Sequence, residues 1–293
     1  MRHAWATVAL WLLRAIAALP YPAVRTIGNA AGSLTYWLAA PRRRISLINL
    51  RLCFPQLSER ERARIAHAQF RHFVRSFIDR FILWYGSRER IERLVRIEGI
   101  EHFERHLGKP MILLAPHFAG LDAGGLRLCL DHRMATMYAR QKNPVLDEAV
   151  RRGRARFNDP VLVSRTEGIR AAVRALRNGL PFYFLPDADL GPRDAVFVPF
   201  FGVPAATVTS TARLAAVAGA VVVPAVTRMT DDGYVLRFYP AWEDYPGDDV
   251  VAATQRMNEF IEQRILEMPE QYLWAHRRFK TRPPGEAGFY AER

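Results

Sequence analysis

A histidine and an aspartate, His117 and Asp122, stand five residues apart directly after a short apolar run. A near-neutral imidazole can take a proton from an attacking hydroxyl, while a carboxylate on its other nitrogen fixes the tautomer and stabilises the imidazolium. On an ideal helix the two side chains would lie about 140° apart, so they meet only if His117 lies in a turn before the helix. Pro116 and Gly120 favour that turn. The pair is therefore a candidate general base and its partner; without supporting context, His117 would merely cap the turn and Asp122 would face solvent.

The residues around this pair indicate how a substrate would reach it. Gly120 and its small neighbours would let a substrate approach the backbone closely, and the N-terminus of the following helix offers N–H groups to a developing oxyanion. The chain has no Gly-x-Ser-x-Gly elbow and Cys129 has no evident partner, so no covalent nucleophile is expected. The cysteines show no metal-ligand spacing, and neither a metal nor a cofactor is expected.

Hydrophobic periodicity predicts the elements that would position the pair. Ser58 opens a capping box, and apolar residues at helical spacing then predict one long amphipathic helix ending near Gly86. Strands are expected at residues 111–115, 134–139, 182–185, 221–226 and 234–239. Helices alternate with them, at residues 120–130, 145–157, 168–178 and 207–218. This alternation predicts an α/β fold with a mixed, largely parallel sheet flanked by helices, in which ligands bind beyond the carboxyl ends of the strands.

The N-terminal segment is apolar first and basic afterwards. Residues 4–19 form an almost wholly apolar stretch interrupted by Arg14, residues 27–40 form a second apolar stretch, and the cluster Arg42 to Arg44 follows. The first stretch is short for a bilayer core of about 30 Å, but basic residues after an apolar segment are typical of the cytoplasmic side of a membrane. We expect residues 1–44 to form a membrane anchor that spans or dips into the bilayer, and residues 45–293 to form the catalytic domain. A cleaved signal peptide and an amphipathic helix packed on the body of the protein are the alternatives.

Composition narrows the class of partner. The 293 residues carry 42 Lys and Arg against 29 Asp and Glu, a formal net charge of +13. The partner is therefore expected to be anionic, which includes a membrane surface, a phosphorylated substrate, an acidic protein and nucleic acid. Because no recognised DNA- or RNA-binding motif is present, nucleic acid is not an expected partner. The hydrophobic content of 50% argues for one substantial core, and the two cysteines are expected to be reduced thiols in a cytosol-facing protein.

Several sequence blocks in a fixed order give the chain a resemblance to one family. They are residues 49–55, the His117–Asp122 motif, residues 152–154, residues 196–202 and residues 269–283. With these blocks the sequence resembles, over nearly its whole length, the lipid A late acyltransferases, which are the lauroyl and myristoyl transferases of Gram-negative bacteria. The resemblance implies transfer of a fatty acyl chain from acyl carrier protein to a hydroxyl of a lipid A precursor. It also implies a place in lipopolysaccharide biosynthesis, at the cytoplasmic face of the inner membrane.

The resemblance assigns roles to single residues as well. His117 would be the base and Asp122 its partner. The family's catalytic arginine falls on Arg154, with Arg152 as the alternative. A fixed cation at this position would stabilise the thioester oxyanion or hold a phosphate.

Two further groups of residues are candidate substrate contacts. Asp187 and Asp189 flank an alanine where family members commonly carry a polar residue, so whatever that side chain does is missing here. The two carboxylates would contact the substrate or else hold a loop turn. In the C-terminal block, Arg277, Arg278 and Lys280 suit phosphate binding at a membrane surface or docking of an acidic carrier protein, with a solvated basic face as the alternative.

Two other functions are compatible with these residues. A related His-Asp acyltransferase acting on glycerol phosphate or another membrane lipid would share the base and differ in its acceptor pocket. A non-catalytic basic protein that binds membranes or nucleic acid would show no turnover, and it would keep its affinity when His117 is replaced.

Overall fold

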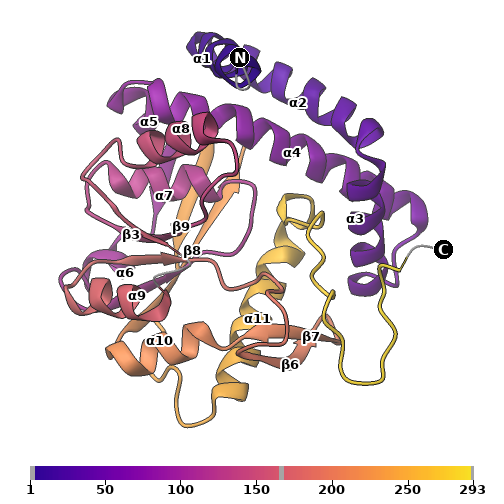
Figure 1. The fold of residues 1–293 in the computed structure, drawn as a ribbon, viewed down its shortest axis with the longest axis vertical. Coiled ribbons are helices and arrows are strands. Elements are labelled where there is room, and N and C mark those ends of the chain that lie inside the picture. Colours follow the sequence, from indigo (N-terminus) through magenta and orange to yellow (C-terminus); the bar gives the residue numbers. More distant parts are fainter. Residues whose placement is uncertain (1–3, 165–167, 292–293) are drawn as a thin grey trace.

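The computed structural model describes residues 4–164 and 168–291, and a seven-stranded sheet forms its centre (Figure 1). The strand order is β1-β9-β8-β2-β5-β3-β4, with strands β1 Val95–Glu98, β2 Met111–Leu114, β3 Ala135–Tyr138, β4 Val161–Ser164, β5 Phe182–Phe184, β8 Val221–Met229 and β9 Tyr234–Phe238. Neighbouring strands are parallel except for β8 and β9, which are antiparallel. The predicted mixed, largely parallel sheet is confirmed.

Helices cover both faces of this sheet. They are α5 Arg88–Leu94, α6 Glu101–Glu104, α7 Leu121–Cys129, α8 Pro144–Arg154, α9 Gly168–Arg177, α10 Ser210–Ala218 and α11 Val250–Glu267. The four residues of β2 are fully buried, and successive side chains point to opposite faces of the sheet. Ile112 and Leu114 pack in the core that includes α11, whereas Met111 and Leu113 pack in the core that includes α7. A strand covered on both faces explains why this segment is apolar without alternation.

Most predicted elements lie within a few residues of their expected bounds, and the main departures are short strands and one long helix, α11. β6 Ala195–Phe200 and β7 Val203–Val208 form a separate antiparallel hairpin that the pattern did not predict. The helix expected at residues 207–218 therefore starts only at Ser210, because Thr207 and Val208 are β-branched residues paired in this hairpin. β1, β4 and α11 also lie outside the predicted set, and the first two are only four residues long, too short to show a period.

The described chain begins with helices α1 Ala4–Ala18, α2 Tyr21–Leu38, α3 Ala40–Cys53 and α4 Glu59–Tyr85. α4 is the predicted long helix. Its capping box is confirmed, since the Ser58 side chain accepts from the backbone N–H of Glu61 and the Glu61 carboxylate accepts from that of Ser58. Within residues 4–164 and 168–291, no helix combines the length and the apolar content needed to cross a membrane.

Helix α2 lies along α4 on the side away from the sheet (Figure 1). Two glycines of α2 face α4. A Cβ atom at Gly28 would lie 2.9 Å from the Cα of Arg75, and one at Gly32 would lie 2.4 Å from the Cα of Arg71. The two backbones therefore touch at positions where no larger residue fits.

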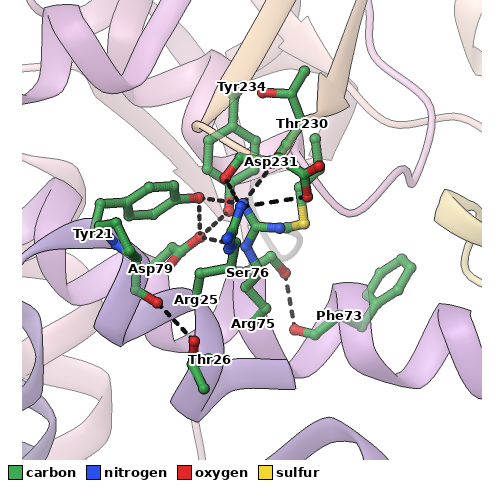
Figure 2. A network of polar contacts seen from close by, with 12 residues as sticks. Tyr21, Arg25, Thr26, Phe73, Arg75, Ser76, Asp79, Thr230, Asp231 and Tyr234 are labelled. Atoms are coloured by element: carbon green, nitrogen blue, oxygen red, sulfur yellow. Dashed lines mark hydrogen bonds and ion pairs between the residues drawn. The ribbon is translucent and has the colours of Figure 1, made fainter. Parts of the chain in front are cut away.

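A buried polar network fixes the rotation of α4 against its neighbours (Figure 2). Tyr21 and Tyr234 donate to the same carboxylate oxygen of Asp79, at 3.1 and 2.7 Å. Arg75 donates to the Tyr21 hydroxyl at 2.5 Å and to the Thr230 carbonyl at 2.6 Å. Burial raises the pKa of Asp79 despite these donors. The network thereby ties α2 and α4 to the turn between β8 and β9.

Candidate active site

His117 lies in the turn between β2 and α7, as the spacing predicted. A second segment, from the far end of the sequence, fixes the backbone of this turn. The Leu273 N–H donates to the His117 carbonyl at 3.1 Å, and the Ala119 N–H donates to the Gln271 carbonyl at 2.9 Å. Phe118 and Tyr272 pair between them as an antiparallel bridge. Part of the C-terminal block thus holds the His117 turn as a short strand would.

The carboxylate on the imidazole is that of Asp187. Its Oδ1 lies 2.7 Å from Nδ1 of His117, and its Oδ2 accepts the His117 backbone N–H at 2.9 Å. Burial alone would raise the pKa of Asp187, but the charge of His117 and these hydrogen bonds lower it to about 2. An ionised Asp187 keeps the proton on Nδ1, which makes Nε2 the nitrogen that accepts a proton.

The expected pairing of His117 with Asp122 is corrected by this geometry. Asp122 lies in the first turn of α7, and its Oδ2 accepts a short hydrogen bond from Nη2 of Arg80 on α4. Its Oδ1 accepts from Nη2 of Arg154 at 3.1 Å. Burial acts to raise the pKa of Asp122, but the two arginines lower it to about 2. Asp122 therefore braces two arginines, and Asp187 takes the position on His117 that Asp122 was expected to fill.

The two candidate arginines of α8 are clearly separated in space. Arg154 contacts Asp122 and lines both of the cavities described below; the place where Arg154 borders the two cavities is called the cavity junction. Arg152 forms an ion pair with Glu148 one turn earlier, at 2.5 Å, and 78% of its side chain is exposed. Of the two alternatives, the structure brings Arg154 to the candidate site.

A cavity of about 760 Å³ lies in front of His117. Arg80 and Arg154 line it together with apolar side chains that include Phe77, Phe81, Trp84, Leu146 and Leu185. A narrower space of about 80 Å³ begins at Asp122 and Arg154 and is lined by Trp84, Leu121, Leu126, Cys129, Met134 and Tyr183 among others. A charged junction thus leads into a narrow apolar pocket, an arrangement suited to a ligand with a polar group and a hydrocarbon chain. Among the described residues, no cluster of His, Cys, Asp and Glu could hold a metal ion.

Gly120 has a packing role in this structure. It precedes α7, and a Cβ atom there would lie 2.7 Å from both the carbonyl oxygen and Cγ2 of Thr227 on β8. A Cβ at Gly124 would lie 2.0 Å from Oγ1 of the same threonine. Gly120 and Gly124 therefore allow α7 to pack closely against β8. The sequence had instead suggested that Gly120 would let a substrate approach the backbone.

Asp189 holds a loop. Its carboxylate accepts from the Gly191 N–H at 2.9 Å and from the N–H and the hydroxyl of Thr281 at 2.7 and 2.9 Å. Its own N–H donates to Nε2 of His276 at 3.0 Å. Burial, followed by the charge of His117, lowers the pKa of His276 to about 4. The turn-forming alternative therefore describes Asp189, while Asp187 belongs to the site.

The three C-terminal cations do not share one environment. Arg278 is only 2% exposed and donates to the Ala206 carbonyl and the Thr207 hydroxyl, at 2.9 and 2.7 Å. The expected role of Arg278 in a surface phosphate site is therefore wrong, because its guanidinium is used inside the protein. Arg277 is exposed beside the Tyr290 ring, and Lys280 is half exposed, with Nζ 3.4 Å from the Asp189 carbonyl.

Comparison of the sequence with known proteins identifies one family. A family model described as bacterial lipid A biosynthesis acyltransferase matches residues 1–281. The lipid A biosynthesis lauroyltransferase of Escherichia coli (strain K12) is 35% identical over 286 residues, covering 96% of this chain and 92% of that protein. The lipid A biosynthesis palmitoleoyltransferase of the same organism is 34% identical over 277 residues, covering 93% and 90%. The crystal structure of a 1-acyl-sn-glycerophosphate acyltransferase from Thermotoga maritima aligns at a TM-score of 0.42 and 16% identity, over 83% of this chain and 98% of that one.

Proposed function

Because the chain belongs to the bacterial lipid A biosynthesis acyltransferase family, we propose that His117 is the general base of its acyl transfer and that Asp187 orients it. The observation that carries this proposal is that His117, paired with the buried Asp187, lines a cavity that shares Arg154 with a narrow apolar pocket. The acceptor is a hydroxyl of a lipid A precursor and the donor is an acyl thioester.

In the proposed reaction the acceptor hydroxyl gives its proton to Nε2 of His117 while its oxygen attacks the thioester carbonyl carbon. The new C–O bond produces a tetrahedral oxyanion. The C–S bond then breaks, and the leaving thiolate takes the proton from the imidazolium. Asp187 stabilises the imidazolium throughout. No enzyme nucleophile is needed, and Cys129 is unsuited to the role because burial raises the pKa of its thiol to about 12.

We place the acyl chain of the donor in the narrow apolar pocket, with the thioester at its mouth. Arg154 lines both spaces, so its guanidinium is close to where the carbonyl oxygen would become negative. Acyl carrier protein is the proposed thioester donor. The formal net charge of +13 favours docking of such an acidic carrier.

A direct assay tests the catalytic assignment. Purified protein receives an acyl carrier protein thioester and a lipid A precursor, and the product is weighed by mass spectrometry. His117→Ala should lower kcat by roughly 10²- to 10⁴-fold, the usual contribution of a positioned general base. His106→Ala, a partly exposed histidine on another loop, is the matched control and should keep wild-type activity.

Two outcomes would change the proposal in different ways. Wild-type transfer by a folded His117→Ala protein would remove the catalytic assignment. Transfer to glycerol phosphate or a lysophospholipid, with none to the lipid A precursor, would replace the acceptor and leave the chemistry in place.

We also propose that the protein works at the cytoplasmic face of the inner membrane, attached through residues 1–44, with residues 45–293 as the catalytic part. The support is an apolar surface on α1 and α2. Trp11, Trp37 and Leu38 are at least 65% exposed, an unusual state for such large apolar side chains. Tryptophan is also the residue type enriched at membrane interfaces. Since α2 is packed on α4, the segment would lie against the bilayer as part of the folded body.

A fractionation experiment tests this attachment. Trp11→Ser combined with Trp37→Ser should move much of the protein from the membrane fraction to the soluble fraction. The matched control replaces Val251 and Leu266 with serine, because these apolar residues of α11 are also exposed. High salt should release the remaining bound protein, since surface charges are screened within about 10 Å at 0.1 M. Recovery of the wild type in the soluble fraction at low salt, without detergent, would refute the attachment.

A further inference from the structure

We infer that Arg80 is a positioning residue for the acyl transfer: by sharing Asp122 it holds the Arg154 guanidinium at the cavity junction and keeps one net positive charge there. The inference rests on the proposed function, because it assumes that the positive charge of Arg154 stabilises the oxyanion formed at the thioester carbonyl. Arg80 lies on α4, far along the chain from the His117 turn and from α8.

The three side chains come from three different helices. Arg80 reaches the junction from α4, Asp122 from the first turn of α7 and Arg154 from the last turn of α8. Each arginine takes one carboxylate oxygen, Arg80 at Oδ2 and Arg154 at Oδ1, so neither engages the carboxylate in bidentate fashion. The side chains are 23%, 28% and 33% exposed, and their charges are only partly screened by solvent.

Charge balance gives Arg80 its role. Asp122 is ionised at neutral pH, so two guanidinium groups and one carboxylate leave one positive charge. Without Arg80, the carboxylate would neutralise Arg154, and both of its oxygens would be open to that one guanidinium. Arg154 would then offer less positive charge to an oxyanion, and it would be drawn toward Asp122. Arg80 therefore supplies the charge that Asp122 would otherwise remove.

Arg80 is itself held in place. Its guanidinium carbon lies 5.0 Å from the centre of the Phe77 ring and 5.9 Å from that of Trp84. Its neighbour in sequence, Asp79, belongs to the buried network that fixes the rotation of α4 (Figure 2). The same helix thus presents Asp79 to α2 and β9, and Arg80 to the cavity. A guanidinium positioned in this way needs no rearrangement when the substrate binds.

A double-mutant cycle on full-length protein tests the inference. Arg80→Gln should lower kcat by roughly 10- to 100-fold, less than the ~10²- to 10³-fold typical of a direct oxyanion donor, with a smaller change in KM for the donor. Arg80→Lys should recover part of the loss, because the charge returns without the planar fork. In an Arg154→Gln background, Arg80→Gln should cost less than about threefold, since the residue that it positions is gone. Arg71→Gln, in the same helix but facing a surface groove, is the control.

The pH–rate profile distinguishes an effect of Arg80 on Arg154 from an effect of Arg80 on His117, the proposed base. The acid limb of kcat should stay in place in Arg80→Gln, because the carboxylate on His117 is Asp187. Two results would overturn the inference. One is a folded Arg80→Gln protein with wild-type kcat. The other is a double variant whose loss of kcat equals the product of the losses in the Arg80→Gln and Arg154→Gln single variants. In either case a strong effect of His117→Ala would leave the proposed function intact, whereas the absence of that effect would refute the proposed function itself.

Discussion

Replacing Asp187 with asparagine removes the charge beside His117 and keeps the shape of the side chain. The pKa of Asp187 falls from its ordinary 3.8 to about 2. At ~1.36 kcal/mol for each pH unit, the folded protein favours the ionised form by roughly 2–3 kcal/mol. Burial opposes ionisation, so the favourable contribution of His117 and of the hydrogen bonds exceeds this net value. If the charged imidazole loses a comparable interaction, kcat should fall by roughly 10- to 100-fold, since each ~1.36 kcal/mol is tenfold in rate.

The sign of the pH effect follows from the same interaction. A neighbouring negative charge favours the imidazolium, so in Asp187→Asn the imidazole should lose its proton at lower pH. The acid limb of the kcat profile should therefore move to lower pH. Measuring kcat from pH 4.5 to 8 with saturating donor and acceptor, and thermal unfolding at each pH, checks both the size and the direction.

Asp122→Asn is the matched comparison for this experiment, because both carboxylates form ion pairs next to the cavity and both have a pKa of about 2. It should lower kcat while the acid limb stays in place, since Asp122 bonds to Arg80 and Arg154. The reverse pattern, with the limb moving in Asp122→Asn and fixed in Asp187→Asn, would refute the assignment of Asp187 to His117.

Three further predictions concern stability. Arg278→Leu should lower the free energy of unfolding by roughly 2–5 kcal/mol in denaturant titration, because it leaves the buried Ala206 carbonyl and Thr207 hydroxyl without this donor. Arg277 is exposed, so Arg277→Leu should change the free energy of unfolding by less than about 0.5 kcal/mol. Gly32→Leu should force α2 away from α4 and lower the melting temperature by several degrees. Gly288→Ala is the control and should leave the melting temperature unchanged, because a Cβ atom added there meets no atom within 4 Å. Equal melting temperatures of the two variants would contradict the close contact between the helices. The pKa values of Asp122 and Asp187 are lower in the folded than in the unfolded protein, so the stabilisation by these carboxylates is complete above about pH 4 and is lost as the pH falls toward 2. The melting temperature of Asp122→Asn should therefore depend less on pH between about 4 and 2 than that of the wild type.

Local sequence signals predicted the framework of the site well. The Ser58 capping box, the apolar run of β2 and the turn that carries His117 each depend on residues close together in the chain. Periodicity and capping chemistry read such segments directly. The short strands of the β6–β7 hairpin, where Pro199 and Pro204 interrupt the pattern, gave no comparable signal.

The partner of His117 could not be read from spacing, because it depends on strand order. Asp187 follows β5, and β5 pairs with β2 in parallel, which brings the ends of these strands to the same edge of the sheet. A signal was nevertheless present, since His117 and Asp187 each follow a buried strand by three residues. The rule that ligands meet the carboxyl ends of parallel strands would have joined them once β2 and β5 were known to be neighbours. Arg80 gave no such signal, because its approach depends on how α4 crosses α7.

The backbone bonds between residues 271–273 and the His117 turn have a consequence for the order of events during synthesis. The ribosome makes β2, His117 and α7 well before it makes Gln271 and Leu273, so the turn lacks these bonds until almost all of the described chain has emerged. Helices α1 and α2, with their exposed tryptophans, are made first. If helices α1 and α2 attach the protein to a bilayer and His117 is the base, as proposed, the nascent chain would meet the bilayer before the His117 turn is fixed, and acyl transfer would begin only after the C-terminal block has docked.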